Sequence, residues 1–497
     1  MLERNVVFKD FRDKIRVALV YPNMYRAGMS NLGFQTLYRL FNDMENVYCE
    51  RFFLDFEHSL ETNSKLKDFD LIAFSWQFEL DAMNILEILQ RSGIPIRRED
   101  RNVMVIAGGP CTVNPYPLKK FIDIFFIGEA ERNLQQFMDN FVAGAGVEEF
   151  ARIEGLYVSK IDNPTKRAYM KNLDDYYSTL QIMSPEAAFG DAFLLEILRG
   201  CPRGCRFCVT GFTTRPRRER SLESLKAVVD EGIRVNNPSK ISIIGPTASD
   251  YSQIEELLEF LSTKGLEVSV PSLRADSVTK EIIEPLVKSG QRSITLAPES
   301  CWRLRSLMNK HITDEQFIEA ANTAFEGGIE NIKLYFMIGS PTERAEDIED
   351  TVSFIKRLKK EAKGKYRLSV NPLVPKPHTP YQWLGFEDIG SLKKKMKIIK
   401  KAGLQAEGED TKEAFLQASI ALGDERLQGV LEKAYFHGKG LGAFRRAFKE
   451  EGIPFDHYVK ERDVGAPLPW DNIDVGVKKS QLRKEFEKSF SGDSRNI

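Results

Sequence analysis

The chain has 497 residues, and its 71 Lys and Arg residues are balanced by 72 Asp and Glu residues, which leaves a formal net charge of −1. This balance gives no overall field that would attract nucleic acid or an anionic membrane, so both are disfavoured as partners. The start has no signal-peptide pattern, and no apolar run approaches the roughly 20 residues needed to span a bilayer, which predicts a cytoplasmic protein of about three domains.

Short apolar strands alternate with helical patterns through residues 1–145. Strands are predicted at residues 16–21, 48–54, 71–75, 103–107 and 122–127. This alternation is typical of a parallel sheet, here a flavodoxin-like (Rossmann-type) domain. Open α/β sheets bind their ligands at the carboxyl ends of the strands, so the loops that follow these strands are the candidate site.

The candidate binding residues of this domain lie in four of those loops. They are Asn23, Tyr25, Gly28 and Ser30 after the first strand, Ser75, Trp76 and Gln77 after the third, Gly108, Gly109 and Pro110 after the fourth, and Gly128 and Glu129 after the fifth. From the residues alone, the glycines could equally serve only to make tight turns. Residues 146–190 show little periodicity and are predicted to be a connector.

The segment 191–385 repeats strand and helix patterns. Strands are predicted near residues 193–199, 240–245, 267–272, 293–297, 331–338 and 366–371, and residues 386–497 are predicted to be mainly helical. The repeats predict a partial (β/α)6 barrel, whose site lies at the C-terminal ends of its strands.

Cysteines follow the first of these strands in the pattern Cys201-x3-Cys205-x2-Cys208. A 4Fe-4S cluster normally takes four Cys and a zinc site four ligands, yet neither a fourth Cys nor a His stands within ninety residues downstream. The spacing therefore predicts a 4Fe-4S cluster with one iron left open, and the alternative is a structural metal knuckle. Six cysteines, three of them in this motif, indicate metal ligands in a reducing compartment.

This motif resembles that of the radical S-adenosylmethionine (SAM) superfamily, whose open iron binds SAM. The resemblance implies that SAM is cleaved reductively to a 5′-deoxyadenosyl radical. It also implies SAM-binding roles for residues that follow the barrel strands, namely Phe207, Thr247, Ser249, Ser272, Arg274, Glu299 and Gly339. Arg274 suits a bidentate contact with the SAM carboxylate, although Arg274 and Glu299 could equally be ordinary ion-paired residues.

The N-terminal loops resemble the cobalamin-binding domain that precedes many radical SAM domains. The resemblance rests on the pair Gly108-Gly109 and on Gly128-Glu129-Ala-Glu131. The usual cobalt-ligating motif D-x-H-x-x-G appears here as Asn23-Met-Tyr25-Arg-Ala-Gly28. The resemblance therefore implies cobalamin without a histidine from this loop, with Tyr25 facing the cobalt. The alternative is a flavodoxin-like domain that has lost its ligand.

Together with the tail Leu468-Pro-Trp-Asp-Asn, these motifs make nearly the whole chain similar to cobalamin-dependent radical SAM proteins. The resemblance implies a C-methyltransferase that methylates an unactivated carbon through a 5′-deoxyadenosyl radical and methylcobalamin. The chain looks most like the archaeal enzymes that modify a protein, such as a glutamine of methyl-coenzyme M reductase. A protein or peptide substrate and a low-potential electron donor such as ferredoxin are the implied partners.

Two other functions stay open at this point. A radical SAM methylthiotransferase, or another radical SAM enzyme acting on RNA or a small molecule, would share the barrel. A methylthiotransferase needs three N-terminal cysteines, whereas only Cys49 and Cys111 precede the barrel. A non-catalytic carrier is the third possibility. The sequence assigns no role to Cys111 or Cys301.

Overall fold

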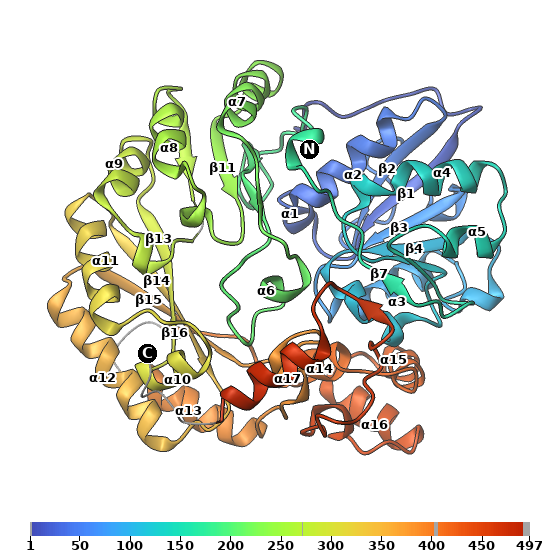
Figure 1. The fold of residues 1–497 in the computed structure, drawn as a ribbon. Helices are drawn as coiled ribbons and strands as arrows, with labels where there is room; N and C mark the ends of the chain where they lie inside the picture. The colour runs from blue at the N-terminus through green and yellow to red at the C-terminus, as the bar shows by residue number, and fades with distance from the viewer. Residues whose placement is uncertain (1, 271, 402–405, 491–497) are drawn as a thin grey trace.

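The computed structural model describes residues 2–270, 272–401 and 406–490. Residue 271 of the predicted strand 267–272, and residues 1, 402–405 and 491–497, lie outside the described part. The N-terminal sheet and the second set of strands stand side by side, and the C-terminal helices lie beneath both (Figure 1). Among the described residues, none of the helices has both the length and the apolarity to cross a membrane.

The N-terminal half is a six-stranded sheet in the order β2-β1-β3-β4-β5-β6. Its strands are β1 (Ile15–Tyr21), β2 (Val47–Phe53), β3 (Leu71–Ser75), β4 (Met104–Gly108), β5 (Ile124–Phe126) and β6 (Leu156–Val158). Neighbours from β2 to β5 are parallel, and β6 runs antiparallel to β5. The five predicted strands are all present, and β6 comes from the segment 146–190.

Helices cover both faces of this sheet because alternate residues of each strand point to opposite faces. Val17 and Leu19 of β1 face a core shared with α2 (Leu32–Asp43) and α4 (Leu134–Val142), whereas Ala18 and Val20 face the core that holds α3 (Asp81–Arg91). The short helix α5 (Val147–Ala151) adds Phe150 and Ala151 to the first of these cores. The sheet is therefore buried on both sides, which leaves its carboxyl edge for ligands.

The C-terminal region completes the second of these cores. Phe415, Leu431 and Phe444 belong to the same buried cluster as Ile85 and Leu89 of α3. They come from α14 (Thr411–Ala421), α15 (Leu427–Phe436) and α16 (Leu441–Glu450). Farther along, β17 (Ile473–Asp474) pairs in parallel with β7 (Thr165–Lys166), and α17 (Lys479–Lys488) follows. The region is mainly helical, as predicted, and it packs on the N-terminal sheet.

The second half of the α/β structure contains the six predicted strands. They form two parallel sheets, ordered β12-β11-β8 and β13-β14-β15-β16. The bounds are β8 (Ala192–Glu196), β11 (Lys240–Ile244), β12 (Glu267–Ser269), β13 (Ser293–Glu299), β14 (Asn331–Ile338), β15 (Lys365–Pro372) and β16 (Ala406–Glu407). The two sheets touch where Leu273 N donates to Thr295 O at 3.1 Å.

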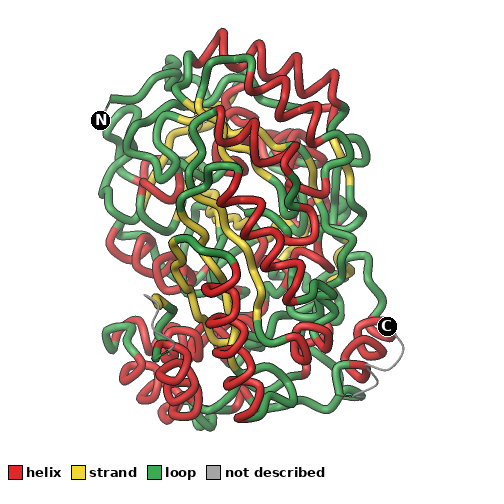
Figure 2. Tube along the Cα trace, turned by 90° about the vertical axis from the view of Figure 1, so that its left-hand side faces the viewer, coloured by secondary structure: helices red, strands yellow, loops and turns green. Residues whose placement is uncertain are grey.

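Helices pack outside these strands, as the side view shows (Figure 2). They are α7 (Leu222–Asn236), α8 (Ile254–Ser262), α9 (Lys280–Lys288), α10 (Trp302–Leu307), α11 (Asp314–Glu326), α12 (Ala345–Glu361) and α13 (Ile389–Lys400). Each helix except α10 follows one strand, so the strand ends face one common side. The predicted α/β class with its β/α units is thus confirmed.

The cysteine loop lies between the two halves. It leaves β9 (Leu198–Arg199), which pairs antiparallel with β10 (Arg218–Glu219), and it carries the short helix α6 (Thr210–Thr213) (Figure 1). Gly200 begins the loop at φ +81°, and a Cβ there would lie 2.6 Å from the carbonyl oxygens of Thr214 and Pro216. Only glycine allows the two arms of this loop to close together.

Candidate active site

The three motif cysteines line one cavity of about 270 Å³, called here the cluster cavity. Their loop is held by backbone hydrogen bonds, from Arg206 N to Met308 O and from Cys208 N to Cys205 O, each 3.0 Å long. The Arg206 guanidinium also contacts Glu485 of α17 at 2.9 Å. The loop is therefore fixed by segments that lie far from it in sequence.

Five of the seven predicted SAM-binding residues line this cavity. They are Phe207, Thr247, Ser272, Arg274 and Glu299. The other two lie behind it. The Ser249 hydroxyl accepts a hydrogen bond from Arg274 N at 3.3 Å, and Gly339 makes a turn at φ +86° against Glu387 and Leu392. For Ser249 and Gly339 the geometry supports only an indirect role, because neither faces the cavity.

Glu299 reaches the cluster cavity through an irregular strand end. The register of β13 with β14 shifts between Leu296 and Glu299, and Glu299 has φ +64°. Such strain in a residue other than glycine is concentrated at functional sites. The Glu299 carboxylate meets Lys310 Nζ at 2.8 Å, which places a charged pair in the cavity wall. Lys310 was not predicted, and no spacing motif marks it.

The donor set suits an iron-sulfur cluster. Burial raises the pKa of the Cys205 thiol to about 11, and the nearby Lys310 charge opposes that rise. A metal cluster supplies the positive charge that ligating thiols need in order to ionise. In the described ranges, no three His, Cys, Asp or Glu side chains are grouped to hold a single metal ion. The structure thus does not support the structural knuckle, whereas a cluster gives each thiol its own iron.

A larger cavity of about 550 Å³, the large cavity, lies between the two halves of the molecule. Its N-terminal wall contains seven predicted cofactor residues, namely Ser30, Ser75, Gln77, Gly108, Gly109, Gly128 and Glu129. Leu198, Arg199, Gly245 and Pro246 form the opposite wall. Gly109 has φ +119°, and a Cβ there would lie 2.4 Å from the Trp76 carbonyl oxygen. The predicted loops therefore converge on one space.

Tyr25 does not line the large cavity, which corrects the prediction that it faces a cofactor. Only 3% of the residue is exposed. Its hydroxyl donates to Glu3 or Ser184, with oxygen separations of 2.6 and 2.7 Å, and its ring packs edge-on against Phe53 and Phe56. The first loop forms the helical turn α1 (Tyr25–Gly28), which places this side chain in the core.

The other predicted residues of the first loop also turn away from the large cavity. Asn23 Nδ2 donates to Asp81 Oδ1 at 2.8 Å. Gly28 packs so tightly that a Cβ would lie 2.5 Å from the Phe53 ring. Trp76 and Pro110 line a different cavity. The first loop therefore contributes its later part, from Ser30 onward, to the large cavity.

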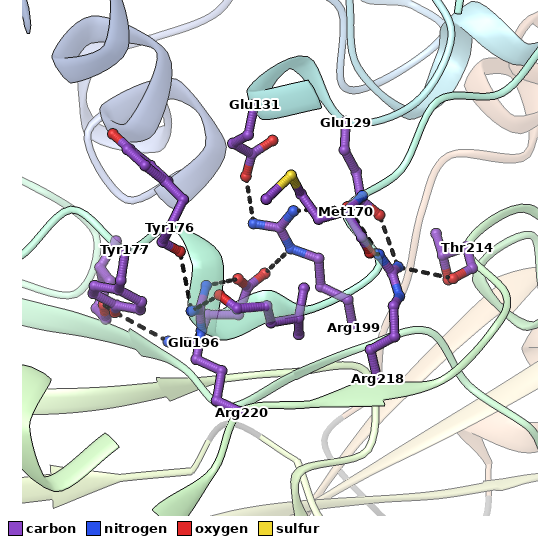
Figure 3. Close-up of polar contacts among 12 residues, drawn as sticks. Glu129, Glu131, Met170, Tyr176, Tyr177, Glu196, Arg199, Thr214, Arg218 and Arg220 are labelled. Atoms are coloured by element: carbon purple, nitrogen blue, oxygen red, sulfur yellow. Dashed lines mark hydrogen bonds and ion pairs between the residues drawn. The ribbon is translucent and has the colours of Figure 1, made fainter. Parts of the chain in front are cut away.

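The Glu129 carboxylate is occupied by two arginines from the other half of the molecule (Figure 3). Arg218 contacts its two oxygens at 2.9 and 2.7 Å, and Arg199 contacts Oε2 at 3.0 Å. The Arg199 guanidinium also donates to Glu131 at 2.6 Å and to Glu196 at 2.7 Å. Because Arg199 lies directly before the cysteine loop, this Glu129 network fixes one wall of the large cavity to that loop.

The charge state of Glu129 follows from these contacts. Burial alone would raise its pKa, but the hydrogen bond from Arg218 and the charges of Arg199 and Arg218 outweigh burial and hold the pKa below its usual value. Met170 N also donates to the carboxylate at 2.9 Å. Glu129 is therefore a wall residue whose oxygens are already engaged by the protein.

A third cavity of about 240 Å³ adjoins the other two. Its lining includes Trp76, Gln77, Glu79, Pro110, Cys111, Val113, Lys376, Pro377, Gln417 and Ile420. Burial raises the pKa of the Cys111 thiol well above its usual value, so Cys111 is a neutral wall residue. Thr210, two residues after the last motif cysteine, lines all three cavities. Its proximity to the motif was the only sequence signal for it.

The remaining cysteines do not form a second cluster site. Cys49 is fully buried in β2, and Cys111 belongs to the third cavity. Cys301 is buried in an apolar cluster and lies 3.7 Å from Asp347 Oδ1. The N-terminal half thus lacks the three cysteines that a methylthiotransferase needs.

Comparisons with known proteins agree with this division of the chain. Residues 33–159 match the family model described as radical SAM proteins, N-terminal, and residues 195–355 match the radical SAM superfamily model. The chain is 35% identical to the uncharacterized protein MJ0966 of Methanocaldococcus jannaschii, over 92% of this chain and 98% of that protein.

More distant similarities point the same way. The uncharacterized methyltransferase PH0819 of Pyrococcus horikoshii is 27% identical and covers 52% of this chain and 59% of its own. Among solved structures, the radical SAM methyltransferase TsrM of Kitasatospora setae, with cobalamin and a [4Fe-4S] cluster bound, aligns with a TM-score of 0.58. That alignment covers 74% of each chain at 16% identity, so it shows a shared fold.

Proposed function

This chain belongs to the radical SAM superfamily, and we propose that it is a cobalamin-dependent C-methyltransferase using SAM and a 4Fe-4S cluster. One observation carries the proposal. The large cavity, lined by the predicted cobalamin loops, shares Thr210 and Pro246 with the cluster cavity. Two cofactors bound there would be neighbours. The cobalamin and cluster in TsrM, which has the same fold, support this assignment.

Bound together, the cluster and SAM supply a 5′-deoxyadenosyl radical, and cobalamin supplies a transferable methyl group. Cys201, Cys205 and Cys208 would ligate three irons. Arg274 lies 2.7 Å from Asp276, which orients its guanidinium at the cavity wall, where it would hold the SAM carboxylate. Glu299 would accept hydrogen bonds from the ribose hydroxyls or from the methionyl amine of SAM.

The N-terminal loops would hold cobalamin by close contact. Gly108 and Gly109 present bare backbone to the large cavity, and Ser30, Ser75 and Gln77 offer polar groups. No histidine precedes His58 in the sequence, and Tyr25 is turned into the core. We therefore propose that the first loop provides no ligand to the cobalt, which would ease departure of a methyl group.

The substrate we propose is a protein residue, such as a glutamine of methyl-coenzyme M reductase, modified in the cytoplasm with electrons from a ferredoxin-like donor. Support comes from the sequence similarity to archaeal protein-methylating enzymes described above. The methylthiotransferase alternative is not favoured, because Cys49 and Cys111 cannot form a second cluster site.

The test is an anaerobic incubation of the reconstituted protein with SAM that carries a trideuterated methyl group, a low-potential reductant and a glutamine-containing peptide. We expect 5′-deoxyadenosine together with a peptide that has exchanged one hydrogen for the labelled methyl group, detected by mass spectrometry. Cleavage of SAM with the label found as a methylthio group on RNA would contradict the proposal.

A further inference from the structure

We propose that the third cavity receives a side chain of the substrate and selects one that is uncharged and carries a hydrogen-bond acceptor. This inference rests on the proposed function, because it assigns the cluster cavity to SAM and the large cavity to cobalamin. It adds a substrate site whose lining comes from both halves of the molecule and from α14.

The position of the third cavity is the first argument. A transfer among three reactants requires all three to lie next to one another in reactive geometry. Thr210 lines the cluster cavity, the large cavity and the third cavity, so the three spaces meet at one residue. With two of them assigned to cofactors, the third is placed for the remaining reactant.

An unpartnered donor is the second argument. Trp76 lines the third cavity and is only 1% exposed. Its indole Nε1 is buried, and no hydrogen-bond partner for it exists among the described residues. Nearly all buried donors in native proteins are paired, so an acceptor oxygen from a ligand would complete this one.

The charges in the cavity wall form the third argument. Glu79 Oε1 lies 2.5 Å from Lys376 Nζ, and Glu79 Oε2 accepts from Gln417 Nε2 at 2.8 Å. Both carboxylate oxygens are thus engaged, and the acid and the amine neutralise each other. A ligand with a net charge would enter without a counter-ion in this wall, which burial penalises.

Size and apolar lining complete the argument. Pro110, Val113, Pro377 and Ile420 supply apolar surface. The volume of about 240 Å³ lies below the roughly 300–1,000 Å³ typical of whole small-molecule sites, which fits one side chain of a longer chain. Asn and Gln are the protein side chains that join an apolar stem to a neutral carbonyl oxygen. The class is therefore a neutral amide side chain within a peptide.

The experiment uses full-length protein reconstituted with its cluster and hydroxocobalamin. Equilibrium dialysis measures binding of radiolabelled N-acetylglutaminamide, with N-acetylglutamate α-amide and N-acetyllysinamide as charged probes. We expect the neutral probe to bind at least about tenfold more tightly than either charged probe. Trp76→Phe, which keeps the ring and removes the N–H, should weaken the neutral probe about tenfold, the usual size for one buried hydrogen bond.

The matched control is Trp302→Phe, because Trp302 is 41% exposed on α10, away from all three cavities. It should bind the neutral probe as the wild type does. Equal binding or no binding of the three probes by cobalamin-loaded wild type would overturn the inference while the proposed function stands. Loss of cobalamin from Trp76→Phe would also overturn it, since Trp76 would then belong to the cofactor site. Wild type that takes up no cobalamin would instead overturn the proposed function.

Discussion

The cluster cavity and the large cavity differ in where their walls come from. The cluster cavity is lined mainly by residues at the ends of successive strands of one repeating β/α unit, together with the cysteine loop. The large cavity has walls from two halves of the molecule, joined by the Glu129 network. Residues that share one architecture are predictable from their order in the chain. Residues that meet across two architectures depend on how the halves dock.

The largest expected effect tests the cluster cavity. Cys205→Ala should remove a cluster ligand and lower SAM cleavage by more than about 10³-fold, because the cluster supplies chemistry that the protein cannot replace. Iron content and 5′-deoxyadenosine formation are the measurements. Cys49→Ala, in the core of β2, is the matched control and should keep its iron. Retention of a full cluster by Cys205→Ala would contradict the assignment.

The next test compares neighbouring glycines of the large cavity. Gly109→Ala should lower the free energy of unfolding by about 3–4 kcal/mol, because its Cβ would meet the Trp76 carbonyl oxygen and its φ of +119° strains an L-residue. Gly108→Ala, whose nearest neighbour would be 3.6 Å away, should change it by less than about 1 kcal/mol. Denaturant unfolding measures both, and equal effects would show that the tight approach at Gly109 is absent.

A third test loosens the join between the halves. Glu129→Gln leaves Arg218 and Arg199 without a carboxylate and should cost about 2–3 kcal/mol of unfolding free energy, a little less than a fully buried pair. The control Glu148→Gln changes an exposed residue of α5 and should cost almost nothing. An unfolding free energy equal to that of the wild type would mean that this network does not hold the halves together.

Acid unfolding sharpens the same point. Because the folded-state pKa of Glu129 lies below its usual value, the ionised carboxylate stabilises the fold at neutral pH. That stabilisation is lost as the pH falls through the folded-state pKa, below the usual range for Glu. The wild type should therefore lose its advantage over Glu129→Gln in acid. A difference that stays constant with pH would contradict this origin.

The smallest effect concerns the residue that the structure moves out of the large cavity. Tyr25→Phe removes a hydroxyl that contacts Glu3 and Ser184, so it should cost about 1–2 kcal/mol of unfolding free energy. The absorption spectrum of bound cobalamin should be unchanged. A shifted cobalamin spectrum would return Tyr25 to the cofactor site.

Much of the fold could be predicted from the sequence. The strands of both halves, the three cysteines and residues such as Arg274 and Glu299 follow from periodicity and from the family resemblance. Lys310 could not be predicted, because it reaches Glu299 only through the turn of the chain after α10. Arg199 and Thr210 flank the motif, but only the docked halves give them their partners. Tyr25 was misplaced because the family motif describes a loop, whereas here the chain forms a helical turn packed on β2.

The most direct measurement is anaerobic reconstitution with iron, sulfide and hydroxocobalamin, followed by absorption and electron paramagnetic resonance spectra of the desalted protein. The proposal predicts one 4Fe-4S cluster and one cobalamin for each chain. A cluster without cobalamin would contradict the proposal, since the large cavity would then serve another ligand.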